Sequence, residues 1–398
     1  MKAKQISLIL AVFMCVGLFT GCQSSKLRSF SEDSAEESTA ATSSGSETTT
    51  KDYTQPYESY NPDEVMLTVN GIDVTWGELF YWYVYDVSNM EKTYGDITDW
   101  DAPCSFASDK TNREYVMENA LDTVKHYCAL ESKAKELGVS LSAEDQTKLQ
   151  STWNDNVKSY GNGDEETFLA YLEKSYLSKD LYDHINEVSM LYDRMLNNMF
   201  GTNGEKLSQS DILDKATDMG YVRVKHILIS TKDDSGATLS DDKIAEKQTQ
   251  AEGLLSELKG ITDQTALEKR FDEMITQYGG DPGVEYYTEG YTFIPGKGTM
   301  DASFETAAGK LSEYGLSDLV KTDYGYHIIL RLPLTTTATV EYSSETSKTT
   351  LGYYVAENMF GSETDNWTNE STVKLTKTYQ DMDIAKVFEK ATATTSEG

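Results

Sequence analysis

The chain has 398 residues, of which 38% are hydrophobic and 25% are charged, and its formal net charge is −31. A charge of this sign repels phosphate backbones and anionic lipid head groups, so it argues against nucleic-acid binding and against electrostatic attachment to a membrane surface. The length predicts two or three domains, and the hydrophobic fraction is sufficient for packed cores.

The N-terminus has the pattern of a secretory signal. Two lysines precede an apolar run over residues 6–19, and small residues follow before Cys22. We therefore expect a signal peptide over residues 1–21. The sequence Phe-Thr-Gly-Cys that ends at Cys22 resembles a bacterial lipobox, although that motif usually begins with Leu. The resemblance implies cleavage before Cys22 and attachment of fatty acids such as palmitate to its thiol, and the alternatives are a plain secreted protein and an uncleaved anchor.

Two cysteines remain after Cys15 leaves with the signal and Cys22 receives lipid. Cys104 and Cys128 are expected to form either one disulfide in an oxidising compartment or two free thiols. Neither their spacing nor their neighbours indicate a metal site.

A polar tract follows the signal. Residues 22–61 are rich in Ser, Thr and Glu and contain almost no large aliphatic side chains. Such a segment buries too little apolar surface to offset its chain entropy, so we expect a disordered linker. A linker of this kind lets a lipid-tethered domain reach beyond the membrane surface.

Residues 62–218 are predicted to form a mostly α-helical domain. An Asn-Gly turn at residues 70–71 closes a short hairpin at its start. Thr111 and Glu114 have the spacing of a capping box, and Ser142 caps a further helix. Apolar residues recur at helical spacing after both caps, which indicates ordinary helical core, and no catalytic motif is apparent.

The pattern changes near residue 219. The run YVRVKHILIS (221–230) is rich in β-branched residues and predicts a strand. Two helical patterns follow, then a glycine-rich stretch over residues 279–298, a short helix capped by Asp301, and a closing strand. This order indicates an α+β domain over residues 219–333.

Residues 219–333 resemble the parvulin family of peptidyl-prolyl cis/trans isomerases. The resemblance rests on His226 in VKHILI, Asp281 after the second helix, the pair Met300 and Phe304, and His327 in VKTDYGYHIIL. Two such histidines in strands, with the Met/Phe pair between them, form a specific combination. The resemblance implies a rotamase that uses neither a metal nor another cofactor.

Isomerisation of an X–Pro bond crosses a barrier of about 20 kcal/mol because amide resonance must be broken. No bond is made or cut, so a catalyst must hold the proline ring in an apolar pocket and stabilise the twisted amide more than either planar form. Met300 and Phe304 are four residues apart and share a face of one helical turn. The resemblance makes them the proline pocket, with Phe293 and Tyr324 as further substrate-binding residues; filling an ordinary core is the alternative.

The remaining candidates are polar. The resemblance implies a hydrogen-bonded pair of His226 and His327 beneath the substrate, with Thr322 in the same network. Asp281 matches the position where parvulins carry Cys or Asp near the reacting carbonyl, although Asp-Pro-Gly at residues 281–283 is also good turn chemistry.

One stretch departs from the family pattern. Parvulins usually carry a Gly-Gly-Asp-Leu-Gly run before the Met-x-x-x-Phe helix, whereas residues 288–300 here read TEGYTFIPGKGTM. Gly290 and Phe293 are kept, but the diglycine and the Leu are not. The rim of the pocket is therefore expected to differ from that of other parvulins.

The flanking segments resemble PrsA/SurA-type foldases. That resemblance implies that residues 334–394 pack with the helical domain and that the rotamase domain is inserted between the two parts. We expect an isomerase and folding chaperone for secreted, partly folded polypeptides with X–Pro bonds, held by lipid at the extracytoplasmic face of the cell membrane. A non-enzymatic peptide-binding holdase and a lipid-anchored binding protein that borrows the fold remain open.

Overall fold

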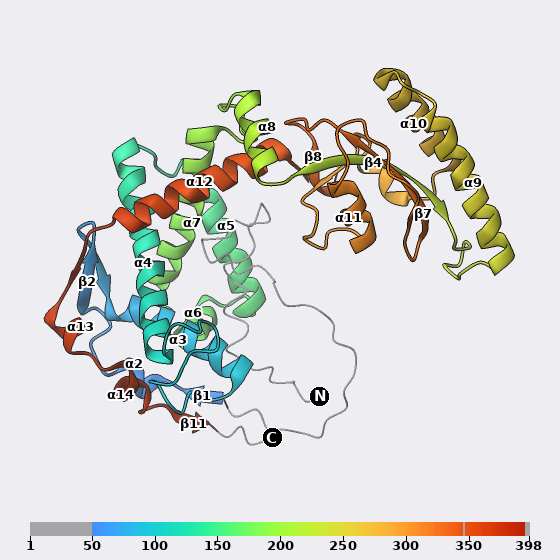
Figure 1. Ribbon diagram of the computed structural model, residues 1–398. Coiled ribbons are helices and arrows are strands. Elements are labelled where there is room, and N and C mark those ends of the chain that lie inside the picture. Colours follow the sequence, from blue (N-terminus) through green and yellow to red (C-terminus); the bar gives the residue numbers. More distant parts are fainter. Residues whose placement is uncertain (1–49, 345–346, 395–398) are drawn as a thin grey trace. The chain divides into compact units, whose positions relative to one another are not determined.

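The computed structural model describes residues 50–344 and 347–394 (Figure 1). The predicted signal peptide, the lipidation site Cys22 and the predicted linker up to residue 49 lie outside the described residues. The described chain divides into two compact units. Unit 1 ends at Asn198 and resumes at Met359, and unit 2 covers Met199–Asn358.

Unit 1 is mainly helical. None of the helices that the structure describes is both long and apolar enough to cross a membrane. The helices of unit 1 are α2 (Thr54–Tyr57), α3 (Trp76–Tyr94), α4 (Asn112–Leu137), α5 (Ala143–Tyr160), α6 (Glu165–Glu173), α7 (Lys179–Phe200), α13 (Lys377–Asp381) and α14 (Ile384–Phe388). The last two residues of α7 belong to unit 2. Its strands are β1 (Thr50–Asp52), β2 (Val65–Val69), β3 (Ile72–Thr75), β10 (Val373–Leu375) and β11 (Thr392–Thr394). Helix α12 (Leu351–Glu370) begins in unit 2 and ends in unit 1.

The N-terminal and C-terminal parts of unit 1 pair along the backbone. Strand β10 pairs with β2, which pairs with β3, and β1 pairs with β11, all antiparallel. Residues that are more than 300 positions apart therefore share two sheets. Residues from 359 onward belong to unit 1, together with the helical part.

Order begins earlier than the sequence predicts. Tyr53 is buried, its ring lies 5.6 Å from that of Phe388, and its hydroxyl donates to Glu91 at 2.7 Å. The prediction of a disordered linker through residue 61 was therefore wrong from residue 50 on. The physical reason is that aromatic side chains in this polar tract supply buried surface that its average composition conceals.

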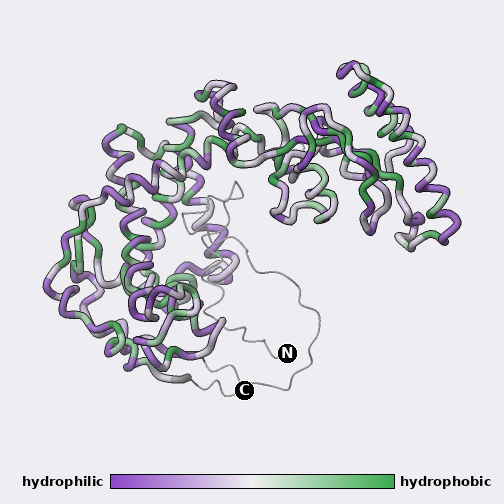
Figure 2. The backbone as a smooth tube through the Cα atoms, in the orientation of Figure 1, coloured by the Kyte–Doolittle hydropathy of each residue, from purple (hydrophilic) through white to green (hydrophobic). Residues whose placement is uncertain are grey.

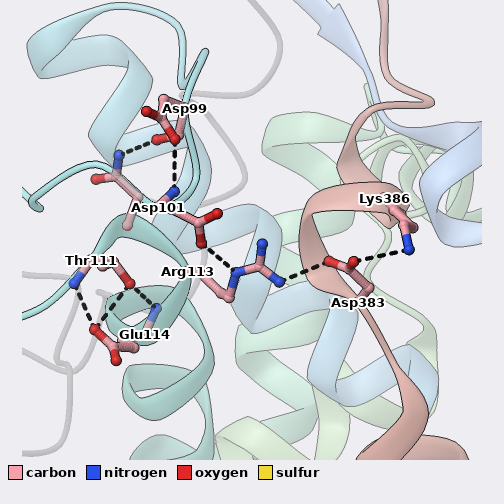
Figure 3. Close-up of polar contacts among 8 residues, drawn as sticks. Asp99, Asp101, Thr111, Arg113, Glu114, Asp383 and Lys386 are labelled. Carbon is pink, nitrogen blue, oxygen red and sulfur yellow. Dashed lines mark hydrogen bonds and ion pairs between the residues drawn. The ribbon is translucent and has the colours of Figure 1, made fainter.

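The loop between α3 and α4 is held by polar contacts (Figure 3). Arg113, in the first turn of α4, donates from Nε to Asp101 at 3.1 Å and from Nη1 to Asp383, which precedes α14, at 2.9 Å. Thr111 and Glu114 form the predicted capping box, with the Thr111 side chain accepting from the Glu114 N–H and the Glu114 carboxylate accepting from the Thr111 N–H. Cys104 in this loop and Cys128 in α4 are both buried and free, so of the two alternatives the structure has free thiols.

Unit 2 contains the predicted α+β domain. Its helices are α8 (Gln209–Asp218), α9 (Asp241–Lys259), α10 (Gln264–Tyr278), the 3₁₀ turn η1 (Pro282–Glu285) and α11 (Ala302–Gly309). Its strands are β4 (Val222–Ser230), β5 (Tyr291–Phe293), β6 (Val320–Lys321), β7 (Gly325–Leu332), β8 (Thr339–Ser344) and β9 (Ser347–Thr350). Four of them form an antiparallel sheet in the order β5-β4-β7-β6. This mixed architecture confirms the predicted fold class.

The sheet is covered differently on its two faces. One face carries Ile227, Ile229 and Ile328 and packs against α9 and α10; the other carries Val224 and Ile329 and packs against α11. In Figure 2 the strongly hydrophobic stretches of β4 and β7 are green, whereas α9 is mainly purple and white. Because side chains alternate along a strand, this arrangement separates the hydrophobic core under α9 and α10 from the face of the sheet that packs against α11.

Unit 2 is wider than the predicted residues 219–333. The hairpin β8–β9 belongs to it, because Tyr342 on β8 lies against Tyr286 and Tyr287 with ring centroids 5.0 and 6.2 Å apart. The expectation that all of residues 334–394 pack with the helical domain was therefore wrong for this hairpin. Its short, polar sequence gives no sign of which unit its one aromatic side chain contacts.

Candidate active site

The two predicted histidines lie on the face of the sheet that faces α11. In the register of β4 and β7, His226 is opposite Ile329 and Leu228 is opposite His327. The histidines are therefore diagonal neighbours on one face, which is within reach of their rings. Both are buried, and their Nδ1 atoms are 3.1 Å apart.

The histidine pair is continued at both ends. Asp281, which precedes η1, lies with Oδ2 2.9 Å from His226 Nε2. Thr322, between β6 and β7, lies with its hydroxyl 2.8 Å from His327 Nε2 and accepts from the N–H of Tyr324 at 3.2 Å. Four side chains from separate segments thus form one hydrogen-bonded chain.

The ends of this chain determine its direction. An ionised Asp281 only accepts, so neutral His226 carries its proton on Nε2 and accepts through Nδ1. His327 then donates from Nδ1 and accepts the Thr322 O–H at Nε2. Every ring nitrogen of both histidines has a partner in this arrangement.

The pKa values agree with a neutral His327 and an ionised Asp281. Burial, and next the proximity of His226, lower the pKa of His327 to about 4, against the opposite effects of Asp281 and Asp301. For Asp281, burial acts to raise the pKa, but hydrogen bonds from His226, Tyr291 and the Gly283 N–H outweigh it and lower the pKa to about 2. At neutral pH His327 is therefore uncharged, and Asp281 carries a negative charge at its end of the chain.

The apolar part of the site surrounds the histidines. Phe304 on α11 lies edge-on to both rings, with centroids 5.1 Å from His226 and 5.4 Å from His327. Phe293 is buried with its ring 6.2 Å from that of Phe304, and Met300 packs against the same cluster while remaining partly exposed. Tyr324 is different, because its side chain is 62% exposed. The structure thus brings together all the predicted residues of unit 2, with Tyr324 joined through its backbone.

Glu305 is one residue of this region that the sequence analysis missed. It is only 3% exposed and accepts backbone N–H groups of Gly296 at 2.5 Å, Gly298 at 3.3 Å and Met300 at 2.8 Å. Burial opposes its ionisation, yet these bonds lower the pKa of its carboxyl. Glu305 therefore holds the loop that presents Met300. In the sequence, Glu305 is an acidic residue in the first turn of a helix, which commonly stabilises the helix through its dipole. Its bonds to the loop before α11 are visible only in the folded structure.

Tyr291 is the second residue that was missed. It is buried, its ring centroid lies 5.4 Å from that of His226, and its hydroxyl donates to Asp281 Oδ2. Its position in the unusual stretch 288–300 was the available signal. The departure from the family pattern thus coincides with a polar contact to the network.

The arrangement is suited to non-covalent chemistry on a ligand that has an apolar ring beside a polar group. Phe304, Phe293 and Met300 supply apolar contact surface, and the histidine chain supplies hydrogen-bonding groups of fixed direction next to it. A buried network with every partner satisfied keeps its geometry when a ligand arrives, and that is the property that electrostatic stabilisation of a strained amide requires.

Comparison with protein-family models points to the same segment. Residues 207–331 match the family model described as the PPIC-type PPIASE domain. A foldase protein PrsA from Staphylococcus epidermidis is 29% identical over 174 residues, which are 43% of this chain and 47% of the relative. The chain thus matches about half the length of the curated relatives it resembles.

Two solved structures are also similar. PrsA from Bacillus subtilis has 21% identity, with 83% of this chain and 93% of that chain covered and a TM-score of 0.21. The peptidylprolyl isomerase PrsA from Bacillus cereus has 18% identity, with 83% and 98% covered and a TM-score of 0.29.

Proposed function

We propose that this chain, whose residues 207–331 form a parvulin-type peptidyl-prolyl isomerase domain, is an extracytoplasmic foldase that isomerises X–Pro bonds in partly folded secreted polypeptides. The observation that carries the proposal is the hydrogen-bonded chain Asp281–His226–His327 lying directly beside Phe304.

The mechanism is non-covalent. The proline ring binds against Met300, Phe304 and Phe293, and the peptide carbonyl before it lies over the histidine pair. Twisting about the C–N bond localises the nitrogen lone pair, and a catalyst that favours this form over both planar forms lowers the barrier. The fixed polar groups beside the pocket act in a partly desolvated site, where hydrogen bonds and charge have more effect than in water. Asp281 orients His226, and Thr322 orients His327, so the pair keeps one geometry through the reaction.

Unit 1 is proposed to hold non-native clients while unit 2 acts on their prolines. The curated relatives are named foldases, which supports a role in folding, and unit 1 is mainly helical. A diacylated Cys22 would keep both units at the outer face of the cell membrane. Mass spectrometry of the mature protein tests the anchor, since Cys22→Ala should abolish both the acyl mass and membrane association.

A refolding assay tests the function. The client is a reduced, unfolded protein whose slow refolding phase is limited by X–Pro isomerisation, and its aggregation is followed by light scattering in parallel. The full chain should accelerate the slow phase and reduce aggregation, and Phe304→Ala should remove the acceleration alone. Reduced aggregation with an unchanged slow phase would instead favour the non-enzymatic holdase. The altered pocket rim is the feature that keeps this alternative open.

A further inference from the structure

Tyr291 contacts the histidine network in two ways, through its ring beside His226 and through its hydroxyl on Asp281. It is the first residue of β5 and pairs with Val224 on β4, so its side chain lies on the same face of the sheet as His226, two positions further along β4. The side chain is 7% exposed. A buried tyrosine hydroxyl needs a partner, and here the partner is Asp281 Oδ2.

The carboxylate of Asp281 is held by three donors. Oδ2 accepts from His226 Nε2 at 2.9 Å and from the Tyr291 hydroxyl, and Oδ1 accepts from the Gly283 N–H at 3.0 Å. Rotation of the carboxylate would break at least one of these bonds. The tyrosine and the histidine share one oxygen, so the tyrosine determines where that oxygen lies relative to His226.

The position of Gly283 gives independent evidence that the turn accommodates the Tyr291 hydroxyl. A Cβ added at residue 283 would lie 2.2 Å from the Tyr291 hydroxyl oxygen and 3.3 Å from its ring carbon Cζ. The contact with the hydroxyl is far shorter than real contacts allow. The turn after Asp281 therefore leaves a space that fits the tyrosine and no additional side chain.

We infer that Tyr291 is a positioning residue whose hydroxyl fixes the Asp281 carboxylate. With the carboxylate fixed, His226 keeps its proton on Nε2 and accepts a hydrogen bond from His327 at Nδ1. The altered pocket rim thus contributes a hydrogen bond to the network. The catalytic consequence rests on the proposed isomerase function, whereas the effect on the histidine rings does not.

The test compares Tyr291→Phe with Tyr287→Phe. Tyr287 stacks on Tyr291 with centroids 4.8 Å apart and has no hydrogen bond to Asp281, so its variant removes a neighbouring hydroxyl and keeps the ring. In Tyr291→Phe we expect kcat for a proline peptide to fall about tenfold with KM nearly unchanged, which corresponds to the loss of one hydrogen bond to a charged group. Tyr287→Phe should retain wild-type kcat.

Two NMR readouts separate positioning from loss of packing. The ¹⁵N shifts of the His226 ring should change from a single Nε2–H tautomer to a tautomer mixture in Tyr291→Phe. The ¹³C signal of the Asp281 carboxyl should titrate at higher pH, because its ionised form has lost a donor. The charged and titratable groups facing Asp281 and its histidines are His226, His327, Asp301, Tyr287 and Tyr291, and only Tyr291 changes in the variant.

Gly283→Ala gives a second route to the same contact. The added methyl should displace the hydroxyl and reproduce the Tyr291→Phe spectra, while in a Tyr291→Phe background it should have little further effect. Unchanged His226 nitrogen shifts and an unchanged Asp281 titration in Tyr291→Phe would overturn the inference, as would equal effects of Tyr287→Phe. If wild-type protein lacks isomerase activity, the proposed function fails, and the ring-nitrogen spectra still decide the positioning role.

Discussion

Replacing Glu305 by Gln should destabilise unit 2 without affecting unit 1. The two carboxylate oxygens serve opposite sides of the loop, since Oε2 accepts from Gly296 and Gly298 and Oε1 accepts from Met300. Glutamine has one acceptor oxygen, and its amide N–H₂ would face the donors on the other side. At least one buried N–H then lacks a partner and the remaining bonds lose their charge, so we expect unfolding of unit 2 to become easier by about 2–4 kcal/mol.

The chain contains an internal control for this measurement. All five tryptophans, at positions 76, 82, 100, 153 and 367, lie within unit 1. In a urea titration, tryptophan fluorescence therefore follows unit 1, and far-ultraviolet circular dichroism follows both units. Glu305→Gln should move a circular-dichroism transition to lower urea and leave the fluorescence midpoint unchanged.

The pH dependence gives the sign of the effect. Because the folded-state pKa of Glu305 is lowered, its contribution to stability is present above the pKa of the unfolded chain and is lost as the pH falls through the folded pKa. The difference between wild type and Glu305→Gln should therefore shrink in acid. The exposed Glu246 on α9 offers a matched control, whose Gln variant should change stability by less than about 0.5 kcal/mol. A midpoint shift no larger than that of the control would refute the role of Glu305.

Three further predictions follow from the network and the thiols. Asp281→Asn should lower kcat about thirtyfold at unchanged stability of unit 1, because the amide cannot accept from all the donors that now hold the carboxylate; full activity would contradict this. His327, with a folded pKa of about 4 against the usual 6.5, should make the protein less stable as the pH falls from about 6.5 to 4, by up to about 3 kcal/mol, since only the unfolded chain takes up the proton there. A ring titration near pH 6.5 in NMR, or the same pH dependence in His327→Gln, would contradict that assignment. Cys104 and Cys128 should react slowly with a thiol reagent in the native protein and rapidly after denaturation. A mass lower by two hydrogen atoms, as a disulfide gives, would contradict the free thiols.

Strand composition and linked motifs made most of unit 2 predictable. The β-branched run before residue 230, the two helical patterns and the closing strand gave the α+β class, and the parvulin-like motifs brought His226, His327 and Asp281 to one expected site. The backbone register then produces the diagonal placement of the two rings. The helix cap at Thr111 was also predictable, because its partner Glu114 is only three residues away in the sequence.

What could not be predicted depends on contacts between distant segments. Residue type alone does not distinguish Tyr291 and Glu305 from other strand and helix residues. Their roles depend on hydrogen bonds to other segments, Tyr291 to Asp281 and Glu305 to the backbone of residues 296–300. The order at residues 50–61 depends on pairing with residues 392–394 and on the burial of Tyr53, neither of which leaves a local pattern. The hairpin β8–β9 was assigned to the helical domain because its polar sequence does not reveal that Tyr342 packs against Tyr286 in unit 2.

The central claim is that the histidine network beside Phe304 catalyses X–Pro isomerisation, and NMR exchange spectroscopy on a short proline peptide tests it most directly. Cross-peaks between cis and trans forms grow only when exchange is faster than relaxation, so uncatalysed exchange over tens of seconds gives none. Catalytic amounts of the full chain should produce these cross-peaks, and Phe304→Ala or His226→Ala should abolish them while the variants stay folded. Absence of cross-peaks with folded wild-type protein would contradict the account, as would undiminished exchange in both variants.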